Sequence, residues 1–344
     1  MNKITAFAKL IRLPNLLIIA LTQYAIRWGV IYPMYSFINK QLLLNFQNEQ
    51  DISKRITNPH IMQFQVSDME FFFLTLATVM IAAAGYVIND YFDVKIDRIN
   101  KPDQMVIDKG IKRREAMGAH LVISAIAILI AGLISFKLGL WQYSMIYIAC
   151  AVGLWFYTTE FKKQFLIGNI VVALFVALVP FIVGLYELHL AAEKYRVLTY
   201  PPFEVNFKVI FNFVLGFSSL AFLINLVREI LKDAEDLEGD RAFGCRTVPI
   251  VLGIETTKNM VSFLIILIIA IIGYIQKGQW DSNAKLSFIY LLAFIQIPLA
   301  VIIYFIQKAQ TPKDFRTPDL LSKIVMLTGV LYTFIIYYSF MNNV

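Results

Sequence analysis

The chain has 344 residues, of which 58% are hydrophobic and only 16% are charged, and its formal net charge is +7. Soluble domains are usually about 25% charged and about 45–50% apolar, so this composition excludes an ordinary soluble domain. Several stretches run for about 18 or more residues with almost no charge, enough to cross about 30 Å of hydrocarbon as a helix. We therefore predict an all-α, polytopic integral membrane protein.

Nine transmembrane helices are predicted in chain order, in a single membrane domain over residues 1–344. The candidate spans are 14–36, 69–90, 115–136, 140–159, 165–186, 208–231, 258–276, 284–307 and 319–341. Most connections between them are short. The two long connections, 39–60 and 188–208, are expected on the same side of the membrane.

The loops of one side hold most of the 31 Lys and Arg residues, including those of residues 91–114. The positive-inside rule places this side in the cytoplasm. The net charge then indicates topology and attraction to anionic membrane lipids, and no nucleic-acid partner is expected. Arg27 lies inside the first span, where it either snorkels to the outer interface or meets a buried partner. Snorkelling is the favoured interpretation.

Two acidic motifs close the second and the sixth predicted spans on the basic side. They are NDYFDVKIDR at 89–98 and KDAEDLEGDR at 232–241, and in register they share three acids and a trailing Arg: Asp90, Asp93, Asp97 and Arg98 align with Asp233, Asp236, Asp240 and Arg241. The repetition indicates a duplicated unit. On a helix, spacings of three and four place such acids on one face. Gly239 predicts that the last acid of the second motif lies just past the helix end.

Acids gathered in one cavity would repel each other strongly, since like charges ~4 Å apart cost about 4 kcal/mol at an effective dielectric near 20. Placement for solubility alone would favour Lys at a helix carboxyl end, because acids there oppose the macrodipole. Mg²⁺ prefers carboxylate, water and phosphate oxygens. We therefore predict that Mg²⁺ binds Asp90, Asp93, Asp97, Asp233, Asp236 and Asp240, and in turn holds a diphosphate. Candidate phosphate contacts from flanking bases are Lys95, Arg98, Lys101, Arg228, Lys232 and Arg241.

These residues carry a resemblance to the UbiA superfamily of intramembrane prenyltransferases. NDYFDVKID is similar to its NDxxDxxxD signature, and DAEDLEGD is similar to its second aspartate-rich motif. RLPN at 12–15, YTTEFKKQFLIGNIVVAL at 157–174 and GDRAFGCRTVPIVLG at 239–253 resemble further family elements. Within the superfamily, residues 228–250 look most like the digeranylgeranylglyceryl phosphate synthases, the ether-lipid branch. In one departure, Gln104 and Met105 stand where the family often has Arg and Pro, and Lys101 or Lys109 would have to replace the missing cation.

The resemblance implies a nine-helix bundle in the inner or plasma membrane, with a central cavity open to the cytoplasmic side. It implies Mg²⁺-dependent transfer of a prenyl group from an allylic diphosphate, such as geranylgeranyl diphosphate, to a lipophilic acceptor, such as a prenylglycerol phosphate. The implied catalytic residues are Asp93, Asp97, Asp236 and Asp240. Asn89, Tyr157 and Lys162 join the flanking bases as implied diphosphate contacts.

Two alternatives stay open from the sequence. The acceptor could instead be an aromatic quinone precursor of the 4-hydroxybenzoate or naphthoate type. A cation-coupled transporter also uses acids inside the membrane, although its acids would usually lie near the bilayer midplane on broken helices. The two motifs here lie at the cytoplasmic ends of their spans, which favours the enzyme.

Overall fold

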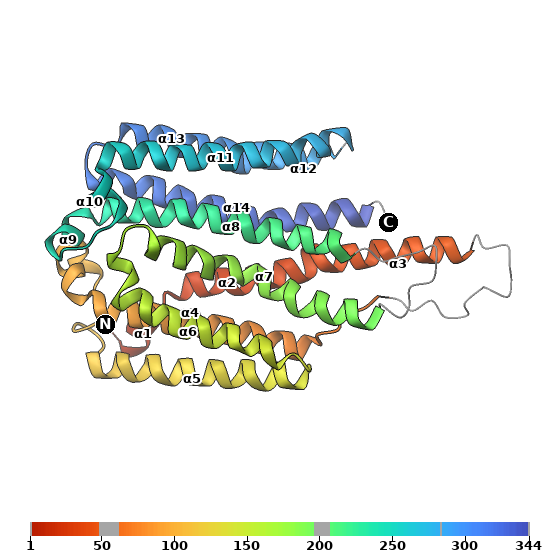
Figure 1. Ribbon diagram of the computed structural model, residues 1–344, viewed down its shortest axis with the longest axis horizontal. Coiled ribbons are helices and arrows are strands. Elements are labelled where there is room, and N and C mark those ends of the chain that lie inside the picture. Colours follow the sequence, from red (N-terminus) through yellow and green to blue (C-terminus); the bar gives the residue numbers. More distant parts are fainter. Residues whose placement is uncertain (1, 48–61, 196–206, 283, 343–344) are drawn as a thin grey trace.

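The computed structural model describes residues 2–47, 62–195, 207–282 and 284–342. In these ranges the chain is almost entirely helical, and the long helices run side by side along the long axis of the molecule (Figure 1). Eight helical segments of the described chain are long and apolar enough to cross a membrane, judged by length and composition. The prediction of an all-α protein with many apolar spans is confirmed.

The helices follow each other with few interruptions. The first half contains α1 (Lys3–Leu10), α2 (Leu13–Ile26), the π-helical turn η1 (Arg27–Ile31), α3 (Tyr32–Gln47), α4 (Asp68–Asn100), α5 (Arg113–Lys137), α6 (Ser144–Thr159) and α7 (Ile167–Tyr195). The second half contains α8 (Phe207–Glu235), α9 (Leu237–Ala242), α10 (Val248–Leu252), α11 (Ile254–Asp281), α12 (Lys285–Leu291), the π-helical turn η7 (Leu292–Gln296), α13 (Ile297–Lys308) and α14 (Arg316–Asn342).

The fourth predicted span, 140–159, is the exception to the long apolar segments. It consists of a 3₁₀ turn, Trp141–Tyr143, followed by α6 with 16 residues. A helix needs about 20 residues to cross a typical bilayer upright. Both long connections begin as helix, since α3 reaches Gln47 and α7 reaches Tyr195, and their remainders, 48–61 and 196–206, lie outside the described residues.

The ends of α4 explain why the first acidic motif is helical. Ser67 and Glu70 form a capping box at its start, with the Ser67 backbone N–H donating to Glu70 Oε2 at 2.9 Å. The helix continues past the predicted end at residue 90 and stops only at Lys101, before Pro102. Proline disfavours the α conformation of the residue before it. All three acids of the motif therefore lie on one helix, as expected.

The second motif breaks at a different place from the one predicted. α8 ends at Glu235, Asp236 occupies the junction, and Gly239 and Asp240 lie inside the short helix α9. Asp240 therefore lies past the end of α8, as predicted, but the break is at Asp236 and not at Gly239. The chain turns before Asp236, so α9 folds back against the end of α4.

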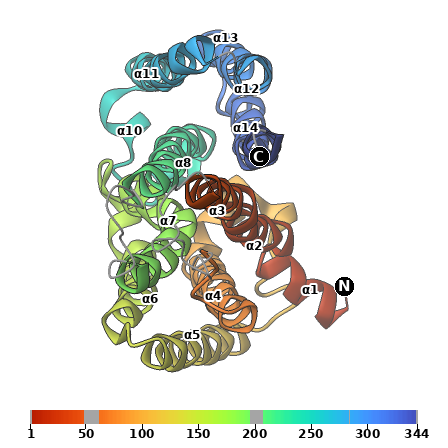
Figure 2. The ribbon, with the colours of Figure 1, turned by 90° about the vertical axis from the view of Figure 1, so that its right-hand side faces the viewer.

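The long helices are arranged as two groups that meet at α8. Figure 2 shows α5 at one edge of the molecule and α11 and α13 at the opposite edge, with α2, α4, α7 and α8 between them. One apolar core contains residues of the helices from α2 through α8, and a second contains residues of α8, α11, α13 and α14. α8 contributes to both cores, so it fixes the second acidic motif relative to both groups.

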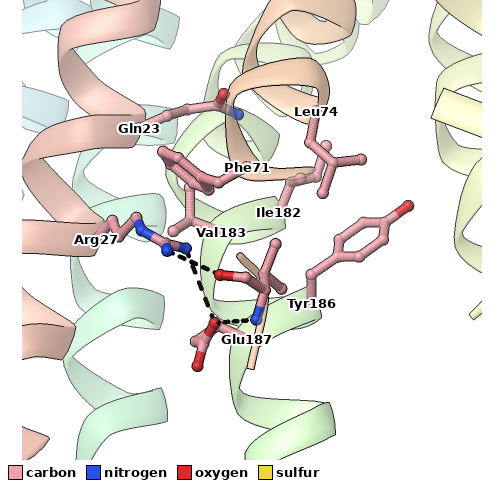
Figure 3. A pocket seen from close by; sticks show the side chains of 9 residues that line it. Gln23, Arg27, Phe71, Leu74, Ile182, Val183, Tyr186 and Glu187 are labelled. Carbon is pink, nitrogen blue, oxygen red and sulfur yellow. Dashed lines mark hydrogen bonds and ion pairs between the residues drawn. The ribbon is translucent and has the colours of Figure 1, made fainter. Parts of the chain in front are cut away.

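Arg27 is buried rather than snorkelling, with 1% of its surface exposed. Its guanidinium donates to the Val66 carbonyl at 2.8 Å and lies 3.9 Å from Glu187 Oε2 (Figure 3). It also donates to Asp68 Oδ1 at 2.8 Å. The guanidinium carbon also lies 4.5 Å from the Phe71 ring centroid. A buried charge is costly unless it is paired. The favoured snorkelling interpretation is therefore wrong, and the alternative of a buried partner is confirmed.

Candidate active site

The first acidic motif presents its carboxylates from the last turns of α4. Asp93 is buried, with 5% exposed, and Asp90 and Asp97 are partly buried. Asn89 Nδ2 donates to Asp93 Oδ2 at 2.7 Å. Arg12 Nη2, just before α2, donates to Asp90 Oδ1 at 2.9 Å. The helix therefore offers one partly buried acidic face, as its spacing predicted.

The second motif presents its carboxylates from the junction of α8 and α9. Asp240 is buried, whereas Asp233 and Asp236 are partly buried. Asn169 Nδ2 on α7 donates to Asp233 Oδ2 at 2.8 Å. Lys101 Nζ lies 2.7 Å from Asp236 Oδ1, and so reaches from the end of the first motif to the second.

Lys162 joins the two motifs electrostatically. It lies on the turn between α6 and α7 and donates to Asp93, while its charge also acts on Asp240. The turn packs closely on α7, because a Cβ at Gly168 would lie 2.8 Å from the Phe161 carbonyl oxygen. Burial lowers the pKa of Lys162, but the charge and hydrogen bond of Asp93, together with Tyr157 and Asp240, outweigh burial and hold the pKa well above its ordinary value. Lys162 therefore stays charged between the motifs.

Asn100 joins the same motifs by hydrogen bonds. Its Nδ2 donates to the Asp236 carbonyl at 3.0 Å, and the Gly239 backbone N–H donates to its Oδ1 at 2.8 Å. The end of α4 is thus fastened to α9, at the end of the molecule where α9 and the amino terminus lie (Figure 1). The two acidic motifs lie side by side at one end of the bundle.

Burial changes the protonation of the acid on α9. It raises the pKa of Asp240 to about 6, although the neighbouring Lys162 charge lowers it, and the charges of Asp236 and Asp93 raise it further. A cation that approached Asp240 would favour its ionised form.

A large cavity begins beside these motifs and follows the helices. It has a volume of about 820 Å³, and its polar lining includes Arg12, Asn89, Tyr157, Arg228 and Lys232. The rest of its wall is largely apolar and comes from α2, α4, α6, α7, α8, α11 and α14. Along α8 the lining runs from Val209 to Lys232, roughly 35 Å at 1.5 Å per residue. Such a shape suits an amphiphile with a charged head and a long hydrocarbon tail.

Three predicted phosphate contacts lie elsewhere. Lys95, Arg98 and Arg241 are exposed, and none of them lines the cavity formed by the described residues. Arg98 Nη2 lies 3.5 Å from Asp108 on the surface. The structure therefore brings Lys101, Lys162, Arg228 and Lys232 to the polar end of the cavity or to the motifs, but not these three bases.

Three contacting residues had no assigned role in the sequence interpretation. Arg12 and Asn169 lie within RLPN (12–15) and YTTEFKKQFLIGNIVVAL (157–174), segments that resemble family elements. Asn100 lies two residues after the first motif and was given no role. Their roles depend on contacts between helices that are distant in sequence, which one sequence does not display.

The oxygen donors suit Mg²⁺ chemically, although they are not gathered as a ready-made cage. Among the described residues, no three His, Cys, Asp or Glu side chains converge closely enough to hold a metal ion. Mg²⁺ typically takes only one or two carboxylates and completes its octahedron with water and phosphate oxygens. The Lys162 ammonium already lies against Asp93, where a cation is stabilised. The residues therefore fit Mg²⁺ that arrives together with a phosphate ligand.

Known proteins resemble the chain over most of its length. Residues 62–325 match the UbiA prenyltransferase family. A digeranylgeranylglyceryl phosphate synthase from Thermococcus sibiricus is 33% identical over 198 residues, which is 56% of this chain and 61% of that protein. Another from Korarchaeum cryptofilum is 31% identical over 254 residues, 73% of this chain and 80% of that protein. The chain thus matches less than two thirds of the first relative's length.

Solved structures agree in fold. A UbiA homolog from Aeropyrum pernix aligns with a TM-score of 0.57 and 14% identity, over 91% of this chain and 96% of the other. A UbiA homolog from Archaeoglobus fulgidus bound to DMAPP and Mg²⁺ aligns with a TM-score of 0.52 and 15% identity, over 95% and 98%. With the match over residues 62–325, these similarities establish that the chain belongs to the UbiA prenyltransferase family.

Proposed function

We propose that the protein is a Mg²⁺-dependent prenyltransferase. The donor is an allylic prenyl diphosphate, for which geranylgeranyl diphosphate is our choice, and the acceptor is a prenylglycerol phosphate used in lipid biosynthesis. The acceptor follows the curated relatives, which are digeranylgeranylglyceryl phosphate synthases. The observation that carries the proposal is the joining of the two acidic motifs, by Lys162 and Asn100, beside a long apolar cavity.

The metal would be held by the six aspartates of the two motifs. The Archaeoglobus homolog binds DMAPP and Mg²⁺ together, which supports the same pairing for this chain. When bound, Mg²⁺ supplies positive charge that neutralises the leaving diphosphate. Lys101 and Lys162 add donors for the phosphate oxygens, since each ammonium already lies against a motif carboxylate.

The cavity wall would then protect the reaction from water. Breaking the bond between the prenyl carbon and the diphosphate oxygen leaves an allylic cation, and the acceptor oxygen attacks that carbon and loses its proton. The largely apolar lining excludes water that would otherwise quench the cation. The Tyr157 and Tyr86 rings line the cavity near Asn89, and aromatic faces stabilise cations.

The membrane arrangement completes the proposal. We infer nine membrane crossings in a single domain, with α6 and its preceding turn as the short fourth crossing. The excess of Lys and Arg on the motif side supports a cytoplasmic active site. Prenyl diphosphate would enter there with its head at the motifs and its tail along α8.

The test is Mg²⁺-dependent diphosphate release from geranylgeranyl diphosphate by the full chain in detergent. Asp93→Ala and Asp240→Ala should each lower the rate at least 100-fold, because each removes a buried carboxylate from one motif. Glu238→Ala is the matched control, since this acid lies inside the second motif but is exposed. It should keep the original rate. Release that survives both aspartate changes would refute the assignment.

A further inference from the structure

The polar end of the cavity also carries a group of basic residues that form no ion pair with a motif aspartate in the described part of the chain. They are Arg228 and Lys232 on α8 and Lys323 on α14, and they line the cavity together with Asn225 on α8. We name these four residues the basic wall. Three of them are cations in the wall of a largely apolar cavity, where charged side chains are costly, so their presence needs a chemical reason.

The basic wall makes its ion pairs with acids outside the six motif aspartates, although the charge of Lys232, at the start of the second motif, also acts on Asp240. Arg228 Nη1 lies 2.9 Å from Glu229 Oε1, and its Nε lies 3.1 Å from Asp319 Oδ1. Lys323 Nζ lies 2.6 Å from Asp319 Oδ2. Lys232 Nζ is 3.9 Å from Glu229 Oε2, beyond hydrogen-bond distance. In the described part of the chain, these cations pair with Glu229 and Asp319 and not with a motif aspartate.

The buried side-chain amide of Asn225 is independent evidence that a ligand binds at the basic wall. Its side chain is 1% exposed, and its Nδ2 has no hydrogen-bond partner among the described residues. A buried donor without a partner costs about 1–3 kcal/mol, so nearly all such groups in proteins are satisfied. Asn225 lies one helical turn before Arg228 and lines the same cavity. A ligand with acceptor oxygens placed there would satisfy it.

We propose that the basic wall binds the phosphomonoester head group of the acceptor lipid. This inference rests on the proposed prenyltransferase function and adds the site that recognises the second substrate. The donor diphosphate occupies the aspartate motifs with Lys101 and Lys162, so the wall on α8 and α14 is free for another anion. Arg228 and Lys232, which sequence reasoning gave to the diphosphate, are reassigned to the acceptor.

The charge of the wall selects the class of head group. Three cations against Glu229 and Asp319 leave one positive charge, and Arg12 adds a second once Asp90 turns to a metal ion. Arg12 and Glu229 line the same cavity, and the charge of Arg12 acts on Glu229. A phosphomonoester carries about −1.5 to −2 at pH 7, and a carboxylate carries about −1. The wall therefore fits a phosphate better than the carboxylate of an aromatic quinone precursor.

The test measures lipid binding by the full chain in detergent, with three probes of equal chain length: an alkylglycerol phosphate, the same alkylglycerol without phosphate, and a 4-alkoxybenzoate. The variants are Lys323→Met, whose side chain is 45% exposed, and Asn225→Ala, which removes a donor without a partner. Neither change leaves a fully buried charge unpaired, so both should fold. Lys308→Met is the control, because this lysine lies outside the cavity lining.

The alkylglycerol phosphate should bind best, and each variant should weaken it about tenfold, the equivalent of about 1.4 kcal/mol. Binding of geranyl diphosphate with Mg²⁺ should stay unchanged in both variants, and Lys308→Met should change nothing. Weaker geranyl diphosphate binding with unchanged phosphate-lipid binding would overturn the proposal. Equal or tighter binding of the alkoxybenzoate would overturn the choice of phosphate.

The two proposals can fail separately. If the wild-type protein releases no diphosphate from geranylgeranyl diphosphate, the proposed reaction fails. Phosphate-lipid binding that still depends on Lys323 and Asn225 would then uphold the basic wall as a phosphate site by itself.

Discussion

Replacing Gly239 by alanine should loosen the joint between the two acidic motifs. A Cβ at this position would lie 2.5 Å from the Nδ2 and the Oδ1 of Asn100. The Asn100 amide would have to move, and both of its hydrogen bonds, to the Asp236 carbonyl and from the Gly239 N–H, would break. A net hydrogen bond is worth about 0.5–1.5 kcal/mol, so the expected loss of unfolding free energy is about 1–3 kcal/mol.

A double-mutant cycle tests whether Asn100 is the cause. Asn100→Ala alone should lose a similar amount, because it removes the same two hydrogen bonds. Adding Gly239→Ala to Asn100→Ala should then cost less than about 0.5 kcal/mol, since the obstructing amide is gone and neighbouring substitutions are not additive. Chemical unfolding in detergent measures stability, and the Mg²⁺ concentration needed for diphosphate release measures the alignment of the motifs.

Gly118→Ala is the control, because a Cβ there meets no atom of the described chain within 4 Å. This change on α5 should be neutral, or stabilising by about 1 kcal/mol through helix propensity. Two additive losses in the Asn100 and Gly239 cycle would refute the reasoning, because they would place the strain of Gly239→Ala somewhere other than Asn100.

Three further outcomes are expected. Mg²⁺ affinity should fall about tenfold per pH unit below pH 6, because protonated Asp240, with its pKa raised to about 6, must lose a proton to bind metal. Titrations with Mg²⁺ from pH 5 to 8 measure this affinity. An affinity that does not change with pH would contradict the prediction. Lys162→Met should tighten Mg²⁺ binding in the absence of diphosphate, since no ammonium competes for Asp93, and it should weaken diphosphate binding. Calorimetric titrations measure both affinities. Changes of the two affinities in the same direction would contradict the role of Lys162. Arg27→Met should lower stability by about 3–5 kcal/mol, because it leaves the buried carboxylate of Glu187 without its counter-charge. Thermal unfolding should recover in part with Glu187→Gln added, and no recovery would count against the pairing.

Hydrophobic run length was enough to predict most of the fold. Each long membrane-spanning helix requires a run of apolar residues, and such a run can be recognised from consecutive residues alone. α6 is the exception, because its 16 residues depend on the 3₁₀ turn before it and on packing against neighbours. Arg27 was misjudged for a related reason, since its partner Glu187 lies on another helix and cannot be read from the first span.

Helical periodicity alone is enough to sort some of the predicted phosphate contacts. The acids at 90, 93 and 97 share one face of α4, and residues two apart on a helix do not face each other. Lys95 follows Asp93 by two residues and is exposed. Periodicity does not predict the contacts of Lys162 and Lys101. Lys162 reaches the first motif from the α6–α7 turn, and Lys101 reaches the second motif from the end of α4.

The cations around the motifs suggest how the site tolerates its own charge. Six partly or fully buried aspartates would repel one another, and Arg12, Lys101 and Lys162 each lie against one of them. If Mg²⁺ bound these carboxylates, Arg12, Lys101 and Lys162 would be free to donate to the oxygens of a diphosphate. Bases that pair with the motif carboxylates and would then contact the substrate need no large movement between the two tasks. The same exchange would turn Arg12 toward Glu229 and the basic wall, so that donor and metal binding prepare the site for an anionic acceptor.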